Sequence, residues 1–386
     1  MDTHMMETRT PEQALMPDLL FSSEQGEIRA YELGEPMVTP AGEWARLERQ
    51  IADALEQARR AGQENPLLMG AFAFDPAEAS CLYVPGRTER GPRPHPRASE
   101  PLTNQAISVQ SLPAAGEFKA SVSAALDSFA SGTLAKVVLS RKLALELRQP
   151  VEPARVLERL VSQNPHAFHF SLPLGGGRCL LGASPELLLR VRDGEIFTHP
   201  LAGSAKRGSA PEQDRAVASA LLASGKDQHE HRLVIDEIRR VLAPHCRALA
   251  IPASPTLMST DTLWHLGTPI RGELHSDEVG VLSLACRLHP TPALCGYPTE
   301  LARQFIRERE PFRRALFSGI VGWCDSRGNG EWAVVIRCGV LDGHRVELFA
   351  GAGIVAGSDP AMEWAETGTK LGTMLRALGV DCEVAL

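Results

Sequence analysis

Two acidic residues, Asp227 and Glu230, lie three positions apart in a segment whose apolar residues have helical spacing. They therefore share one helix face, and that face continues through the apolar Val234 and Ile238. Acids that extend a buried stripe are costly unless they are paired or bound to a cation. Mg²⁺ would suit such a pair, because it binds carboxylate and water oxygens. The alternative is an ordinary helix start, where the helix dipole favours acids.

A second acidic pair, Glu363 and Glu366, lies in a predicted helix at 361–378, and Lys370 follows Glu366 by one turn. A solvated surface salt bridge between Glu366 and Lys370 would explain this spacing without any site. However, the helix follows the glycine-rich segment LFAGAGIVAGSDP, whose backbone N–H groups are able to approach an anion near a helix start. If the two helices meet, their acids can share one cation.

Three further residues could take part in acid–base chemistry or anion binding. Lys136 opens an apolar strand; if buried, its pKa would fall and it could act as a general base, and the alternative is a lysine at the surface. Glu186 lies between two apolar strands in GASPELLLR, where burial would raise its pKa as a general acid requires; the alternative is an exposed turn carboxylate. Arg337 lies inside the β-rich segment EWAVVIRCG and needs an anionic partner, for which a substrate carboxylate is one candidate.

A mixture of helices and short strands must position these residues. Helical spacing predicts helices over 43–61, 117–132, 153–163, 211–224, 226–243, 298–309 and 361–378. Runs rich in β-branched residues predict strands over 26–34, 67–75 and 136–147, four short strands between 168 and 200, and strands around 317–324, 331–338 and 345–350. Consecutive strands with tight turns indicate antiparallel pairing, and meanders with helices between them indicate an α+β fold.

The proline- and arginine-rich segment 88–101 has no periodic pattern and is predicted to be a surface loop. It is the best candidate boundary between residues 1–100 and the strongly patterned region 117–379. We expect the two parts to form one integrated globular unit.

Composition excludes several classes of function. The 386 residues carry a net charge of −7, which does not favour binding to nucleic acid or to an anionic membrane. No apolar run approaches the ~18 residues of a membrane span, and the N-terminus does not resemble a signal peptide. Eight scattered cysteines without Cys-x-x-Cys spacing predict free thiols in a cytoplasmic protein. The lack of a dinucleotide-binding fingerprint gives no reason to expect a redox cofactor.

Eight segments of the chain together resemble the chorismate-utilising enzymes, the family of isochorismate, salicylate, anthranilate and aminodeoxychorismate synthases. They occur in the family's order over about 117–379 and read KVVLSR, GASPELLLR, HPLAGSAKRG, KDQHEHRLV, LWHLGTPIRG, HPTPALCGYP, LFSGIVGWCDSRGNGEWAVVIRC and LFAGAGIVAGSDPAMEWAETGTKL. The resemblance implies large antiparallel sheets with surrounding helices, as in anthranilate synthase component I. Within the family the chain looks most like the isochorismate synthases of catechol siderophore pathways.

The resemblance also implies catalytic and metal-binding roles. Lys136 matches the lysine that activates water for attack at C2 of the chorismate ring, and ammonia-using members typically have glutamine there. Glu186 matches the acid that protonates the departing C4 hydroxyl. Glu230 and Glu366 match the Mg²⁺ ligands, with Asp227 and Glu363 binding through water.

The substrate-binding set follows from the same motifs. Positions that match the surroundings of the substrate carboxylates are Arg337, Lys370 and the backbone at Gly203, Gly351 and Gly353. Positions that match the ring pocket are His265, Leu294 and Phe317. Ser204 and Ala293 complete the substrate-binding set. Ala202 stands where aminodeoxychorismate synthases of the covalent type carry lysine, which argues against that activity.

Three functions are therefore compared. The first is an Mg²⁺-dependent isochorismate synthase that binds chorismate and isochorismate, which we expect to be a monomer with transient contact to a downstream isochorismatase. The second is a bifunctional salicylate synthase, which shares the same lysine and acid; Leu294 favours the monofunctional enzyme. The third is a catalytically silent chorismate-binding module, against which the intact Lys136 and Glu186 argue.

Overall fold

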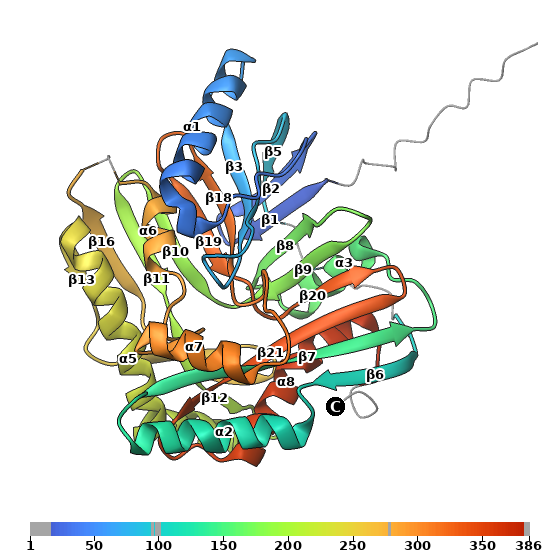
Figure 1. Ribbon diagram of the computed structural model, residues 1–386, viewed down its shortest axis with the longest axis vertical. Coiled ribbons are helices and arrows are strands. Elements are labelled where there is room, and N and C mark those ends of the chain that lie inside the picture. The colour runs from blue at the N-terminus through green and yellow to red at the C-terminus, as the bar shows by residue number, and fades with distance from the viewer. Residues whose placement is uncertain (1–16, 94–95, 97–101, 277–278, 382–386) are drawn as a thin grey trace, which may run out of the picture.

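The computed structural model describes residues 17–93, 96, 102–276 and 279–381. In these residues two large sheets and one small sheet are surrounded by helices, and every strand pairing between them is antiparallel (Figure 1). The predicted α+β class with large antiparallel sheets is confirmed. No helix in this described part of the chain is long and apolar enough to cross a membrane.

The first large sheet has ten strands. Their order is β17 (Gly296–Tyr297), β7 (Lys136–Leu147), β21 (Arg345–Val355), β20 (Cys338–Asp342), β9 (Cys179–Ser184), β8 (Phe168–Pro173), β1 (Leu19–Ser23), β2 (Gly26–Tyr31) and β5 (Arg87–Gly91), and β6 (Ala106–Leu112) also pairs with β7. The long strands β7 and β21 pair from Lys136↔Val355 to Glu146↔Arg345.

The second large sheet has eight strands and the small sheet has three. The eight are, in order, β13 (Cys246–Ala250), β16 (Ile270–Leu274), β11 (Glu195–His199), β10 (Leu187–Arg192), β19 (Gly330–Val334), β18 (Ile320–Asp325), β3 (Leu67–Phe72) and β4 (Cys81–Tyr83). The three are β12 (Leu201–Lys206), β15 (Leu263–Gly267) and β14 (Thr256–Ser259). Both large sheets contain strands from the first hundred residues.

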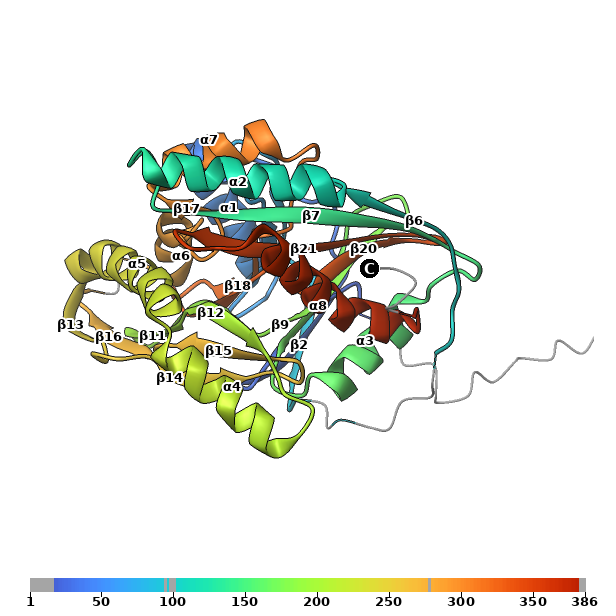
Figure 2. The same cartoon turned by 90° about the horizontal axis from the view of Figure 1, so that it is seen from below.

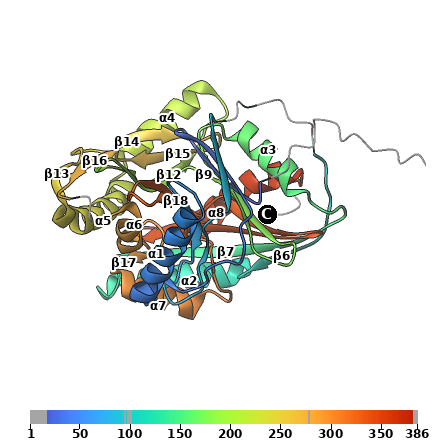
Figure 3. The ribbon, with the colours of Figure 1, turned by 90° about the horizontal axis from the view of Figure 1, so that it is seen from above.

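The helices lie on the outer faces of the sheets. They are α1 (Trp44–Arg60), α2 (Ala115–Ala130), α3 (Pro153–Gln163), α4 (Pro211–Ala223), α5 (Gly225–Leu242), α6 (Val281–Leu288), α7 (Thr299–Arg309) and α8 (Pro360–Leu378), with short 3₁₀ turns at Ala41–Glu43 and Ala243–His245. The small sheet and α4 lie on the side of the molecule away from α2 and α7 (Figure 3).

Alternation along β7 separates a structural face from a functional one. Val137 and Leu139 pack with Phe118 of α2 in an apolar cluster. Because successive strand side chains point to opposite faces, Lys136 and Val138 point the other way. The apolar core between the two large sheets is a separate cluster that includes Phe21 of one sheet and Val321 of the other.

Most predicted elements are present, but several predictions are wrong. The strand at 136–147 and the helix at 153–163 have the predicted bounds. The segment 88–101 begins as strand β5, paired with β2, and is therefore not a surface loop throughout; 94–95 and 97–101 lie outside the described residues. The four strands between 168 and 200 form two hairpins in different sheets, because the chain crosses from one large sheet to the other between β9 and β10.

Candidate active site

A cavity of about 640 Å³ lies where α5, α8, the small sheet and the β7–β21 pair meet. Figure 2 shows α5, β12, β21 and α8 grouped around this part of the molecule. Every site residue predicted from the sequence lines the cavity except Lys136, which is buried behind its wall. The lining members of that set are Glu186, Gly203, Ser204, Asp227, Glu230, His265, Ala293, Leu294, Phe317, Arg337, Gly351, Gly353, Glu363, Glu366 and Lys370.

Lys136 is fully buried, so the surface alternative for this lysine is wrong. Its Nζ lies 2.8 Å from Oε1 of Glu230. Apart from this ion pair, Nζ has no hydrogen-bond partner among the described residues. A buried amine with unused hydrogen-bonding capacity is unusual outside functional sites.

Gly353 allows this ion pair to form. It pairs with Val138 across the β7–β21 ladder. A Cβ at Gly353 would lie 2.3 Å from Oε1 of Glu230 and 3.3 Å from Cε of Lys136. Any side chain there would therefore displace the Glu230 carboxylate.

Glu186 follows the β9 strand at the point where the chain crosses between the large sheets. Its side chain is buried, so the exposed-turn alternative is also wrong. Burial raises the pKa of the Glu186 carboxyl to about 7, although the Leu201 N–H and the charges of Lys136 and Arg337 act in the opposite direction. The group can therefore be protonated near neutral pH, which is the property of a general acid.

The two acidic pairs border the same cavity from α5 and α8. Asp227 and Glu363 lie in the first helical turns, where the dipole favours acids. Glu230 and Glu366 lie one turn further along, beyond the reach of that effect. Burial raises the pKa of Asp227, and the negative charges of Glu230 and Glu366 add to this rise.

This acid cluster is only partly neutralised by lysines. Glu366 is paired with Lys370 at 2.6 Å, as the i,i+4 spacing predicts. Glu363 is paired with Lys226 at 2.9 Å, yet burial and the Glu366 charge still raise the pKa of Glu363. Carboxylate oxygens that repel one another suit a hard divalent cation. Within the described chain, no three or more His, Cys, Asp or Glu side chains form a ready-made metal cluster, so water or substrate would have to complete the coordination.

Arg337 lies between β19 and β20 and not inside a strand, which corrects the prediction. Its φ of 51° is in the left-handed region, so the backbone turns there between the two large sheets. Burial lowers the pKa of the guanidinium to about 10, against the opposing charges of Glu366 and Glu186. No hydrogen bond from this guanidinium to another described residue is present. A buried arginine that faces a cavity in this way is suited to a carboxylate ligand.

The remaining wall combines polar and aromatic groups. Nδ1 of His265 and Oγ of Ser204 are 3.0 Å apart, across the β12–β15 pair. Burial, with the charges of Arg337 and Lys370, holds the pKa of His265 well below its ordinary value, so the imidazole is neutral. Phe317 stacks on Phe349 with ring centroids 5.1 Å apart. A planar, apolar ring with polar substituents would match this lining.

Sequence reasoning missed Lys226, which lines the cavity and neutralises Glu363. A usable signal was present, because a lysine in the first turn of a helix opposes the helix dipole and requires a partner. The structure supplies that partner from α8.

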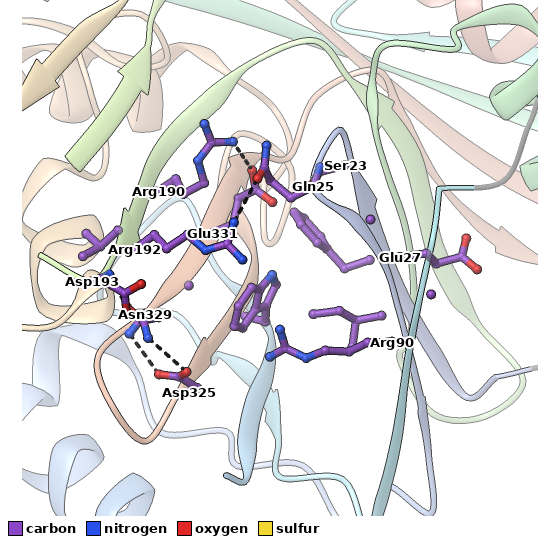
Figure 4. Close-up of a pocket in the computed structure, with 17 residues that line it drawn as sticks. Ser23, Gln25, Glu27, Arg90, Arg190, Arg192, Asp193, Asp325, Asn329 and Glu331 are labelled. Atoms are coloured by element: carbon purple, nitrogen blue, oxygen red, sulfur yellow. Dashed lines mark hydrogen bonds and ion pairs between the residues drawn. The ribbon is translucent and has the colours of Figure 1, made fainter. Parts of the chain in front are cut away.

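A second cavity, of about 260 Å³, lies between the ends of the two large sheets and contains none of the predicted residues (Figure 4). Its lining includes Trp323, on which Arg90 stacks, and the ion pair of Arg190 with the buried Glu331, at 3.2 Å. The Arg190–Glu331 pair can therefore serve as a control for ion pairs that involve a buried glutamate near the first cavity.

Comparison with known proteins agrees with the geometry of the site. The family model described as "Chorismate binding enzyme" matches residues 87–379. A proposed isochorismate synthase of Aeromonas hydrophila is 68% identical over the whole of both chains, and isochorismate synthase EntC of Escherichia coli (strain K12) is 46% identical over 90% of each. The crystal structure of Bacillus anthracis DhbC, a proposed 2,3-dihydroxybenzoate-specific isochorismate synthase, has a TM-score of 0.88 at 35% identity and covers 95% of this chain and 97% of its own. The chain therefore belongs to the chorismate-binding enzyme family.

Proposed function

We propose that this enzyme is an isochorismate synthase, an isomerase that converts chorismate reversibly to isochorismate. Water adds at C2 of the ring, the C4 hydroxyl leaves, and the double bonds shift between these positions. Lys136 accepts one proton from the attacking water. Glu186 gives one proton to the departing hydroxyl, which leaves as water, so that substrate and product are isomers.

One observation carries this proposal: a carboxyl with a pKa of about 7, that of Glu186, lines the cavity between β9 and β10, and the fully buried amine of Lys136 on β7 lies directly behind the cavity wall. A base and an acid on separate elements can act on two positions of one ring. The neutral His265 and the aromatic Phe317 form parts of the wall that such a ring would contact.

Chorismate carries two carboxylates, and the charges around the cavity match them. Arg337 and Lys370 provide positive charge for one of them. Glu230 and Glu366 would hold Mg²⁺ through their oxygens, with Asp227 and Glu363 acting through water. When bound, the ion supplies positive charge for the second carboxylate. Gly203 and Gly351 line the same cavity, where their backbone groups would contact the substrate.

Product analysis tests the proposal. Purified protein incubated with chorismate and Mg²⁺ should yield isochorismate, and EDTA should stop its formation. Recovery of unchanged chorismate would reject the proposed activity. Pyruvate and salicylate, formed without any added lyase, would instead identify a salicylate synthase.

A binding measurement separates the enzyme from a silent chorismate-binding module. Lys136→Ala should bind chorismate and form no product. If wild type and Lys136→Ala both bound chorismate and were equally inactive, the module would be the correct interpretation.

We further propose that the enzyme serves catecholate siderophore synthesis in the cytoplasm. The similarity to DhbC supports this, because 2,3-dihydroxybenzoate is a catechol acid. We expect a monomer that contacts an isochorismatase only transiently. Sedimentation of the purified protein with and without that enzyme would test both statements.

A further inference from the structure

One edge of strand β7 is left without a strand partner beside the cavity. The start of β7 pairs with β17, and its second half pairs with β6 from Lys142 onward. The N–H of Val138 still reaches the carbonyl of Cys295, at 2.8 Å. The next polar groups on this edge, Val138 C=O and Ser140 N–H, have no strand partner in the described chain. Buried backbone groups of this kind require other hydrogen bonds.

An ion pair of side chains fills the gap. Arg314 Nη2 donates to Val138 O at 2.7 Å, and Glu310 Oε1 accepts from Ser140 N at 2.7 Å. The two side chains are joined by Nε–Oε2 and Nη2–Oε1 hydrogen bonds of 2.8 and 2.6 Å. Both side chains are almost completely buried, at 2% and 3% exposure. The pair therefore forms the main-chain hydrogen bonds of β7 that a neighbouring strand would otherwise form.

Arg314 also reaches the wall of the substrate cavity. Its Nη1 donates to Leu294 O at 2.9 Å, and its guanidinium carbon lies 5.9 Å from the ring centre of Phe317. Val138, Leu294 and Phe317 all line the cavity, whereas Arg314 and Glu310 are not among its lining residues. Arg314 thus connects β7, the strand that carries Lys136, to the part of the cavity wall that contains Leu294 and Phe317. A substrate ring would lie against this part of the wall.

We propose that Arg314, held by Glu310, is a positioning residue for isochorismate formation. It fixes strand β7, which carries Lys136, relative to the part of the cavity wall formed by Leu294 and Phe317. This inference rests on the proposed function. A buried ion pair is often no more stabilising than apolar residues of the same size, so stability alone does not account for it. The Arg314–Glu310 pair has three main-chain partners, which are Val138 O and Ser140 N on β7 and Leu294 O in the cavity wall. A misplacement of about 1 Å at such a point can reduce turnover about a hundredfold.

The test compares Arg314→Met, Arg314→Lys and Glu310→Gln with wild type. Arg190→Met is the matched control, because it breaks another ion pair with a buried glutamate, at the second cavity. For each protein the thermal unfolding midpoint is measured first. The values of kcat and KM for isochorismate formation are then measured at a temperature well below that midpoint. Arg314→Met should lower kcat at least tenfold. Arg314→Lys, which keeps the charge and one donor, should recover most of kcat, and Arg190→Met should change kcat and KM less than twofold.

Each outcome decides the inference. A folded Arg314→Met with kcat and KM within twofold of wild type would overturn it, and so would an equal loss in Arg190→Met. If Arg314→Met does not fold, Glu310→Gln decides: wild-type kcat and KM in this variant overturn the inference, and a reduced kcat with a near-normal unfolding midpoint supports it. An inactive wild type would instead remove the proposed function, and this inference with it.

Discussion

Lys136 on β7 and Glu230 on α5 form a buried ion pair, with Nζ and Oε1 2.8 Å apart. The two residues belong to different candidate sets, because Lys136 is the proposed base and Glu230 a proposed metal ligand. If these roles are correct, the proposed base and the proposed cation site lie next to each other at one wall of the cavity.

Replacing Lys136 by alanine should abolish turnover and preserve chorismate binding. Loss of a general base typically reduces the rate 10²- to 10⁴-fold. Fluorescence titration with chorismate measures binding, and chromatography of the products measures turnover. Loss of binding in parallel with loss of activity would show that Lys136 holds substrate instead of acting on water.

Glu186 should give the activity a limb that falls as the pH rises through about 7. The general acid must be protonated, and burial raises the pKa of Glu186 to about 7. Because the Arg337 charge lowers this pKa, Arg337→Gln should move the limb of kcat to higher pH. Glu186→Gln should lose 10²- to 10⁴-fold in kcat. A wild-type profile that stays flat between pH 6 and 9 would contradict the assignment.

The same carboxyl should make stability depend on pH. Its folded-state pKa is raised from 4.5 to about 7, so its contribution is fully present below pH 4.5 and is lost as the pH rises through about 7. Relative to wild type, Glu186→Gln should therefore gain about 3 kcal/mol in unfolding free energy between pH 4 and pH 8, at 1.36 kcal/mol per pKa unit. Urea unfolding at the two pH values measures this. An equal difference at both pH values would show that Glu186 is not desolvated.

The sequence predicts this fold best in elements whose apolar residues recur with one regular spacing. Strand 136–147 and helix 153–163 have the predicted bounds because each is a regular apolar pattern. The sequence patterns do not predict the short strands β12 to β16, because each has only a few residues and, except for the β14–β15 pair, their partners are distant in sequence. Arg337 was placed in a strand for a related reason: its segment has strong β propensity, but the crossing between sheets overrides it.

The sequence predicts which residues line the candidate site, but it does not predict their burial or their ion pairs. Burial of Lys136 depends on Glu230 and on the absence of a side chain at Gly353, and no local pattern shows either. The ion pair of Arg314 and Glu310 was missed because i,i+4 spacing ordinarily indicates a surface pair. Its burial follows from the gap in the β7 edge, which only tertiary structure reveals.

Gly353→Ala should reduce activity far more than stability. The added Cβ would lie 2.3 Å from Oε1 of Glu230, and that atom is the free end of a flexible side chain that can move away. The fold should therefore survive, while the carboxylate is displaced. Gly116→Ala is the control, because it lies in α2 with no atom within 4 Å of the added Cβ. Kinetics and thermal unfolding are measured on both variants; equal activities would show that the position of Glu230 is unimportant.

Mg²⁺ should stabilise the protein as well as activate it. The carboxylates of Asp227, Glu230, Glu363 and Glu366 repel one another, and a bound cation removes that repulsion. A ligand that binds only the folded state raises the unfolding midpoint by an amount set by RT ln(1 + [L]/Kd), so millimolar Mg²⁺ should raise it and EDTA should reverse the rise. Glu366→Gln should need a higher Mg²⁺ concentration for the same shift, whereas Glu347→Gln, on the far part of β21, should behave as wild type. A midpoint insensitive to Mg²⁺ in the wild type, or an identical response in Glu366→Gln, would show that these acids do not hold the ion.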